Sequence, residues 1–201
     1  MLIMTPVSGQ VSGKVQPKYL MAFAMCVVGL AMWHSASLSP DANFGFFAWM
    51  RVFQVVALPF LFIPITTAAY AGLPAEKTNQ ASALINVARN LGGSIGVSLA
   101  GALLAQREQF HQSTLVEHIY PSSPAYQQTI GNAARHFAEQ GASMPDAQRQ
   151  AIGQIGQMIQ DQSALLAYMD VFVAFAIFAA LMVPLALMLK PVKIGHAAPA
   201  H

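Results

Sequence analysis

Three ionisable side chains lie inside long apolar stretches of this sequence: Arg51, Arg89 and Asp170. A charged group is costly in the hydrocarbon core of a membrane, so such a residue indicates a transport path, a proton carrier or a structural ion pair. A long side chain near a helix end can instead reach the headgroups. These three residues are the first candidates for chemistry if the stretches around them span a membrane.

The depth of each group in its stretch separates these roles. At about 1.5 Å per residue, Arg51 lies roughly 6 Å and Asp170 roughly 9 Å from the outer ends of their stretches, and Arg89 roughly 12 Å from the inner end. Arg51 is within reach of the headgroups, which favours snorkelling or a structural hydrogen bond. Asp170 needs a partner, a water-filled cavity or a proton, and Arg51 matches it in depth. We therefore predict an Arg51–Asp170 ion pair, and Asp170 is either structural or the proton carrier.

Arg89 has two polar neighbours on its own stretch, Asn86 and Asn90. Small residues recur here at four-residue intervals, as Ala88, Gly92, Gly96 and Ala100. Small residues at that spacing let two helices approach closely in lipid. The pattern predicts a packed helix face with Arg89 beside it, where a cavity would hydrate the guanidinium. The alternative is plain packing with an arginine that snorkels to the cytoplasm.

The composition places these residues in a membrane protein. Of 201 residues, 55% are hydrophobic and 9% are charged, with a formal net charge of +2. A soluble domain carries about 25% charged residues. The few basic groups form no patch for nucleic acid, and Cys26 is the only cysteine, which excludes an internal disulfide and a thiolate metal site.

Crossing the hydrocarbon core takes about 20 mostly apolar residues in a helix. Four stretches are long enough, and we predict membrane-spanning helices over residues 19–38, 47–72, 81–105 and 164–189. Residues 1–8 are apolar but too short to span, and they read as the end of a helix that begins earlier in a longer protein. The predicted fold class is an all-α membrane protein, a partial helical bundle with an external loop over residues 106–163.

The distribution of Lys and Arg outside the spans predicts the orientation, because basic residues collect on the cytoplasmic side. One side carries Lys14, Lys18, Lys77, Lys190 and Lys193, and the other carries Arg107, Arg135 and Arg149 in a longer loop. The first side, with the tail over residues 190–201, is therefore expected in the cytoplasm. The short turn over residues 39–46 and the loop over 106–163 are expected outside.

The external loop contains two patterns typical of helices. Apolar residues recur at helical spacing from Tyr126 to Phe137, and Ser143 with Asp146 three residues later is typical of a helix start. A second stripe follows, formed by Ala147, Ile152, Ile155 and Ile159. Two amphipathic helices that cap the bundle explain these stripes. The alternative is a docking surface for a partner, such as a periplasmic adaptor.

Prolines at positions 59, 64 and 184 interrupt predicted spans and are expected to kink them. No catalytic motif or metal site is found in the sequence. His111 and His118 lie seven residues apart, about 10 Å along a helix, which is too far to share one ion. We therefore expect no enzymatic activity and no cofactor.

Four segments together resemble the C-terminal third of the fourteen-span drug:proton antiporters of the major facilitator superfamily, the EmrB/QacA type. They are "PVSGQVSGKVQPK", "RVFQVVALPFLFIPITTAAYAGLPAEKTNQASAL", "NVARNLGGSIGVSLAG" and "DQSALLAYMDVF". The resemblance implies that residues 1–8 end span ten and that the four predicted spans are spans eleven to fourteen.

The resemblance also implies roles for particular residues. Pro6 to Lys18 is similar to a degenerate copy of the family's cytoplasmic loop motif, in which Gly9 fits the first glycine and Lys14 the basic residue, while Gly13 stands where an aspartate is expected. Arg51 and Gln54 resemble the arginine and glutamine of the motif in the family's fourth span, where the arginine is linked to proton transfer. The glycine of that motif is replaced by Val55.

As a function, the resemblance implies export of hydrophobic drugs from the cytoplasm through the inner membrane, driven by a proton gradient. It also implies a periplasmic adaptor (a membrane fusion protein) and an outer-membrane channel as partners. The alternative is a truncated, non-transporting membrane subunit that packs against other helices or docks a partner. Nine further spans in frame in the upstream DNA would support the transporter.

Overall fold

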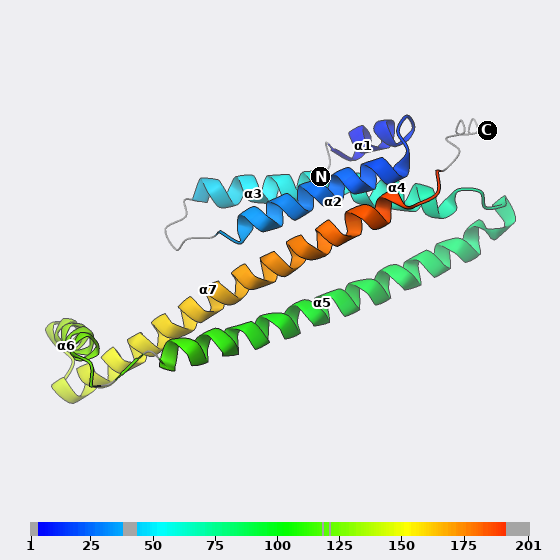
Figure 1. Cartoon of the computed structure of the whole chain (residues 1–201). Coiled ribbons are helices and arrows are strands. Elements are labelled where there is room, and N and C mark those ends of the chain that lie inside the picture. Colours follow the sequence, from blue (N-terminus) through cyan, green and yellow to red (C-terminus); the bar gives the residue numbers. More distant parts are fainter. Residues whose placement is uncertain (1–3, 38–43, 118, 121, 192–201) are drawn as a thin grey trace. The chain divides into compact units, whose positions relative to one another are not determined.

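The computed structural model describes residues 4–37, 44–117, 119–120 and 122–191, and in these ranges every regular element is a helix. Figure 1 shows them in chain order. They are α1 (Met4–Ser12), α2 (Pro17–Ser35), α3 (Phe44–Ala57), α4 (Pro59–Tyr70), the 3₁₀ turn η1 (Ala75–Lys77), α5 (Thr78–Glu117), α6 (Pro124–Glu139) and α7 (Met144–Leu187). The predicted all-α membrane fold is confirmed.

Four segments of the described chain are long and apolar enough to cross a membrane: Pro17–Ser35, Ala48–Tyr70, Thr78–Glu117 and Met144–Leu187. Their number agrees with the prediction, but their ends differ. α5 continues 12 residues past the predicted limit at Ala105, and α7 begins 20 residues before the predicted limit at Ala164. Hydropathy predicts only the part of a helix that lies in the hydrocarbon core of the membrane. The helix can continue into water beyond that part.

The N-terminal helix also differs from its prediction. The helix end predicted over residues 1–8 continues further, and α1 runs to Ser12. The expectations for residues 1–3, for residues 39–43 of the external turn, for His118 and for residues 192–201 of the tail fall outside the described residues.

Proline interrupts the second span as expected. α3 ends at Ala57 and α4 begins at Pro59, whose ring cannot donate a backbone hydrogen bond. α1 packs against α4 at this break, and the Ser8 hydroxyl, which is fully buried, donates to the Pro59 carbonyl at 3.0 Å. A side chain of a neighbouring helix thus holds a carbonyl at the interruption.

Ser8→Ala should weaken this attachment. We expect a loss of about 1 kcal/mol in unfolding free energy, because the buried Pro59 carbonyl loses its donor. Ser37→Ala is the matched control, since the Ser37 hydroxyl is exposed and bonds within its own turn. Equal thermal unfolding of the two variants in detergent would contradict the attachment.

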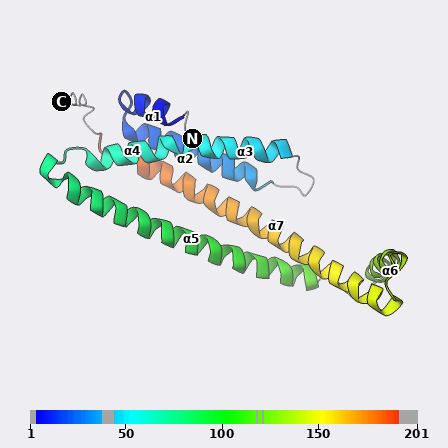
Figure 2. The same cartoon turned by 180° about the vertical axis from the view of Figure 1, so that it is seen from behind.

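The described residues form two compact units, one of residues 1–98 with 172–201 and the other of residues 99–171. In the first unit, α2 packs against α3 and α4, as both views show (Figures 1 and 2). α2 also meets α7, where a Cβ on Gly29 would lie 3.3 Å from the Cβ of Ala179. Glycine therefore permits the close approach of these two helices.

Gly29→Val should push α2 and α7 apart. Overpacking of a tight contact costs about 1–3 kcal/mol, so we expect a clearly lower unfolding temperature in detergent. Gly153→Val is the control, because nothing lies within 4 Å of a Cβ built on Gly153. If both variants unfolded at the wild-type temperature, Gly29 would not be needed for this contact.

In the second unit, α6 packs on the start of α7 around a small core of Ile130, Ala134, Ala147 and Ala151. The predicted helix start is confirmed: α7 begins at Met144, and the Ser143 hydroxyl accepts from the backbone N–H of Asp146. The second stripe is corrected at one position. Ile152 is half exposed, and Ala151 lies in the core in its place.

Candidate transport sites

Arg89 lies in a pocket that α4 and α5 form together. Its Cζ is 6.0 Å from the centre of the Phe62 ring, a cation–π distance. The pocket holds about 520 Å³ and is lined by Phe62, Ile63, Thr66, Thr67, Tyr70 and Arg89. Residues of the kinked second span therefore line the same pocket as Arg89.

Both threonine hydroxyls of this pocket already donate a hydrogen bond within α4. Thr66 donates to the Phe62 carbonyl at 2.7 Å, and Thr67 donates to the Ile63 carbonyl at 3.0 Å. They can present only acceptor lone pairs to a ligand, so the Arg89 guanidinium and the Tyr70 hydroxyl remain as donors. Within the described ranges no acid forms an ion pair with Arg89. The pocket thus combines one cation without a counter-ion, an aromatic face and an apolar wall.

The other predicted polar residues of α5 lie outside this pocket. Asn86 and Asn90 are exposed, as are three of the four small residues. Among the described residues, nothing lies within 4 Å of a Cβ built on Gly92 or Gly96. The face formed by Ala88, Gly92, Gly96 and Ala100 is still predicted to pack tightly, against a helix that the structure does not describe.

Arg51 and Gln54, which resemble a family motif, are in contact. Arg51 Nη1 donates to Gln54 Oε1 at 3.1 Å, and Gln54 Nε2 donates to the Ser35 hydroxyl at 3.4 Å. The arginine is exposed, whereas Ser35 is buried on α2. Gln54 therefore joins Arg51 to the neighbouring helix by hydrogen bonds, which fits the structural role expected for Arg51.

Asp170 has different partners from the one predicted. Its Oδ2 lies 2.7 Å from Nε2 of His111 and 3.4 Å from Nε of Arg107, both on α5. The predicted Arg51–Asp170 pair stays a prediction, because the two residues belong to different units; within its own unit the carboxylate is held by these two α5 residues, and Arg51 bonds to Gln54. The expectation that Asp170 requires a polar partner is met.

The cluster shows how α5 and α7 are aligned. Arg107 and His111 belong to the segment that we predicted as an external loop, whereas Asp170 was placed inside a span. Because the three side chains touch, Asp170 lies level with residues just beyond the predicted end of the α5 span. The carboxylate is therefore nearer the outer edge of the apolar region than its sequence position suggested.

Arg107 and His111 were not predicted as site residues. Arg107 entered only the prediction of orientation, and His111 was considered only as a metal ligand. Their spacing of four residues was an available signal, since it places both side chains on one face of a helix. Phe110 supports them: its ring meets the His111 ring edge-on at 5.5 Å and lies 5.7 Å from the Arg107 guanidinium.

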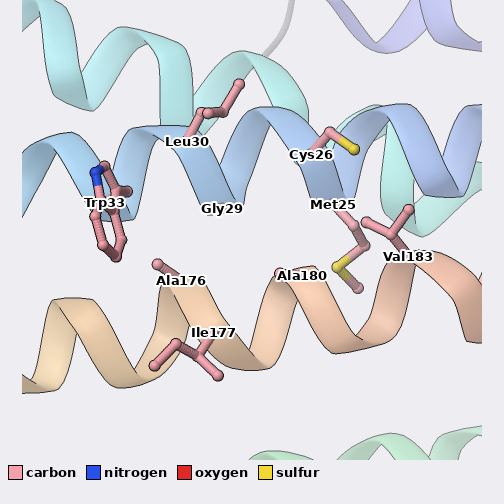
Figure 3. Close-up of a pocket in the computed structure, with 9 residues that line it drawn as sticks. All are labelled: Met25, Cys26, Gly29, Leu30, Trp33, Ala176, Ile177, Ala180 and Val183. Atoms are coloured by element: carbon pink, nitrogen blue, oxygen red, sulfur yellow. The ribbon is translucent and has the colours of Figure 1, made fainter.

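An apolar groove lies between α2 and α7 within the first unit. It holds about 520 Å³, and its lining side chains are shown in Figure 3: Met25, Cys26, Gly29, Leu30, Trp33, Ala176, Ile177, Ala180 and Val183. Met25 and Trp33 point from α2 toward α7. Cys26 is exposed in this groove, and the described residues contain no cluster of three or more metal-ligating side chains.

The residues of the degenerate loop motif lie at the end of α1. Gly9 is helical, Gly13 and Lys14 are in the turn that follows, and all three are exposed. Gly13 has only the Gln10 carbonyl near its Cβ position, at 3.6 Å. The structure places no charged partner against them in the part of the chain it describes.

Comparison with known proteins relates the chain to a set of exporters. The multidrug export protein EmrB of Escherichia coli K12 is 31% identical over 173 residues, which are 85% of this chain and 32% of that protein. The fatty acid resistance protein FarB of Neisseria gonorrhoeae is 25% identical over 190 residues, 94% of this chain and 36% of FarB. EmrB of Haemophilus influenzae is 29% identical over 85% of this chain and 32% of its own length.

The chain thus spans about a third of the length of these relatives. No family model matches it, and no solved structure does. A Bacillus subtilis relative, YhcA, is described as an MFS-type transporter. The agreement with EmrB proteins over most of the chain, together with four helices able to span a membrane, identifies the chain as a multi-pass member of the EmrB/QacA-type branch of the major facilitator superfamily.

Proposed function

We propose that the chain forms part of an exporter that moves hydrophobic, drug-like compounds out of the cytoplasm in exchange for protons. The Arg89 pocket carries this proposal, because it combines a cation, an aromatic ring and an apolar wall on two predicted spans. Ligand sites of about 300–1,000 Å³ with few polar groups are typical of binding sites for drug-sized molecules. The relatives named for multidrug export and fatty acid resistance support the same class of activity.

In this proposal, Arg89 orients an amphipathic compound while Phe62 and Ile63 contact its apolar part. A single guanidinium offers five N–H donors, which suits a carbonyl, carboxylate or other acceptor group on the compound. The threonine hydroxyls accept from a donor group. The pocket therefore fixes one polar end and leaves the rest of the compound to non-directional contacts, which permits many compounds to bind.

The energy for export comes from the proton gradient, without a bound cofactor. The protein lies in the inner membrane with its C-terminus in the cytoplasm, in agreement with the distribution of lysine and arginine. Asp170, Arg51, Gln54, Asn86 and Asn90 are the remaining candidates for the proton and substrate path. A bound proton changes the charge of the path, and exchange requires that substrate and proton favour different conformations.

Drug susceptibility of a host that lacks its own exporters tests this function. Cells that express the full reading frame should tolerate higher concentrations of several hydrophobic drugs than cells with an empty vector. An uncoupler should abolish efflux of a fluorescent compound. Unchanged susceptibility with the protein present in the membrane would refute export and favour a non-transporting subunit.

We further propose that α6 and the start of α7 contact a periplasmic adaptor, which in turn meets an outer-membrane channel. The outer face of α6 is polar and includes exposed Asn132 and Arg135. Arg135→Glu should reduce co-purification of the adaptor at least about threefold, since a reversed rim charge disfavours association. Lys14→Glu on the other side of the membrane is the control. Equal adaptor recovery from both variants would contradict this surface.

A further inference from the structure

The cluster of His111, Asp170 and Arg107 offers a chemistry that the Arg89 pocket does not. We propose that these three side chains form a proton-binding site that is reached from the external side, and that His111 is the group that takes up the proton. This inference rests on the proposed function for the use of the proton. The site itself follows from the geometry.

The hydrogen-bonding pattern leaves one nitrogen of His111 for a second proton. Nε2 lies 2.7 Å from Asp170 Oδ2. A carboxylate only accepts, so Nε2–H is the donor and Nδ1 is the free position. Uptake transfers one proton from external water to Nδ1, and the imidazole becomes an imidazolium. The charge of the cluster then rises by one unit, and release returns the proton to water.

His111 is the member of the cluster suited to this change. The guanidinium of Arg107 keeps its charge at every physiological pH. The Asp170 carboxylate lies between that guanidinium and the imidazole, both of which act as donors to it. Histidine is the side chain whose charge changes between about pH 5 and pH 8. The carboxylate thus serves as the fixed acceptor on α7, and the imidazole on α5 is the group that changes charge.

Water can reach the cluster. The exposed fractions of the side chains are 20% for His111, 33% for Asp170 and 44% for Arg107. Arg107 and His111 also belong to the segment that the basic residues place outside. The charged groups that face His111 are Arg107 from α5 and Asp170 from α7. Glu108 is half-buried on α5 and forms no ion pair with the cluster among the described residues.

Proton binding has a structural consequence. An imidazolium–carboxylate bond is charge-assisted and stronger than its neutral counterpart. A protonated His111 therefore competes better with Arg107 for the same oxygen, Asp170 Oδ2. Protonation of His111 strengthens the contact between α5 and α7, and loss of the proton weakens it. The site thereby links external pH to the contact between the two longest helices.

Histidine NMR on the purified protein tests the site without any transport assay. The ring signal of His111, assigned by its loss in His111→Gln, should move between about pH 5 and pH 8. Asp170→Asn should alter that movement, whereas Asp146→Asn should not. Asp146 is the matched carboxylate, since it pairs with Arg149 on the surface of α7. His136→Gln controls the assignment, because His136 bonds to Gln140 on α6.

A His111 signal that stays constant over this pH range would overturn the proposal. The same holds for a movement that is identical in wild type and Asp170→Asn. Asp170→Glu keeps a carboxylate and serves as the second variant if Asp170→Asn does not fold. A protein whose His111 titrates as expected but which exports no compound would refute the proposed function and leave the proton site intact.

Discussion

Asp170→Asn should strongly reduce export and loosen the outer contact between α5 and α7. The substitution removes the charge that holds His111 and Arg107, whose nitrogens lie 2.7 Å and 3.4 Å from its Oδ2. Hydrogen bonds to charged groups contribute about 1.5–3 kcal/mol, so we expect a loss of this size in unfolding free energy. Transport should fall at least about tenfold, because the proposed proton site loses its fixed acceptor and a loss of about 1.4 kcal/mol in proton-binding free energy corresponds to that factor. Efflux of a fluorescent compound and thermal unfolding measure the two effects.

Asp146→Asn is the control for the unfolding measurement. It removes a surface pair with Arg149 within one helix, which contributes less than about 1 kcal/mol. A double-mutant cycle with Arg107→Gln then separates the arginine contact from the histidine contact. Wild-type efflux and stability of Asp170→Asn would show that the cluster has no part in either.

Arg89→Ala should have the second large effect. It removes the one cation of the α4–α5 pocket, which lies over the Phe62 ring. Because a hydrogen bond from a charged donor contributes about 1.5–3 kcal/mol, we expect the apparent affinity for transported compounds to fall roughly tenfold. Stability should change little, because Arg89 is exposed. The concentration dependence of efflux measures the affinity.

The Arg89→Lys variant distinguishes the effect of the positive charge from that of the planar guanidinium. Lysine keeps the charge but loses the planar fork, so we expect an intermediate loss that differs among compounds. Lys18→Ala is the control for efflux affinity, since the Lys18 ammonium lies 5.0 Å from the centre of the neighbouring Tyr19 ring and outside this pocket. If Arg89→Ala transported with wild-type affinity, the pocket would not be the binding site.

The helices could be predicted because the membrane constrains the sequence strongly. A span requires about 20 apolar residues, and four such stretches stand out even where proline interrupts them. The break at Pro59 follows from the missing N–H of proline. The start of α7 follows from the capping group at Ser143. These features are local, so the sequence around each of them is sufficient.

The ends of α5 and α7 could not be predicted in the same way. Hydropathy falls after Ala105, but glutamine, arginine and glutamate are good helix formers and continue α5 to Glu117. The loss of an apolar pattern therefore marked the end of the span and not the end of the helix. Before Ala164, the helix predicted to start at Ser143 joins the span without a break, so that α7 is one helix from Met144 to Leu187.

The partners of Asp170 depend on how α5 and α7 are aligned, and no local sequence pattern predicts that alignment. Depth within a span pointed to Arg51, because both residues were measured from predicted ends. The real α5 is longer, and its extension brings Arg107 and His111 level with Asp170. The Arg89 pocket was easier to anticipate, since a short connection between Tyr70 and Thr78 keeps α4 and α5 adjacent.

Transport into everted membrane vesicles tests the central claim most directly. A vesicle whose lumen is made acidic reproduces the proton gradient across the inner membrane, with the cytoplasmic face of the protein outside. We predict that vesicles with the full-length protein accumulate a hydrophobic drug only while the gradient lasts, and that Arg89→Ala and Asp170→Asn each reduce the accumulation strongly. Accumulation that persists after the gradient has collapsed, or that is unaffected by both substitutions, would contradict proton-driven export through these sites.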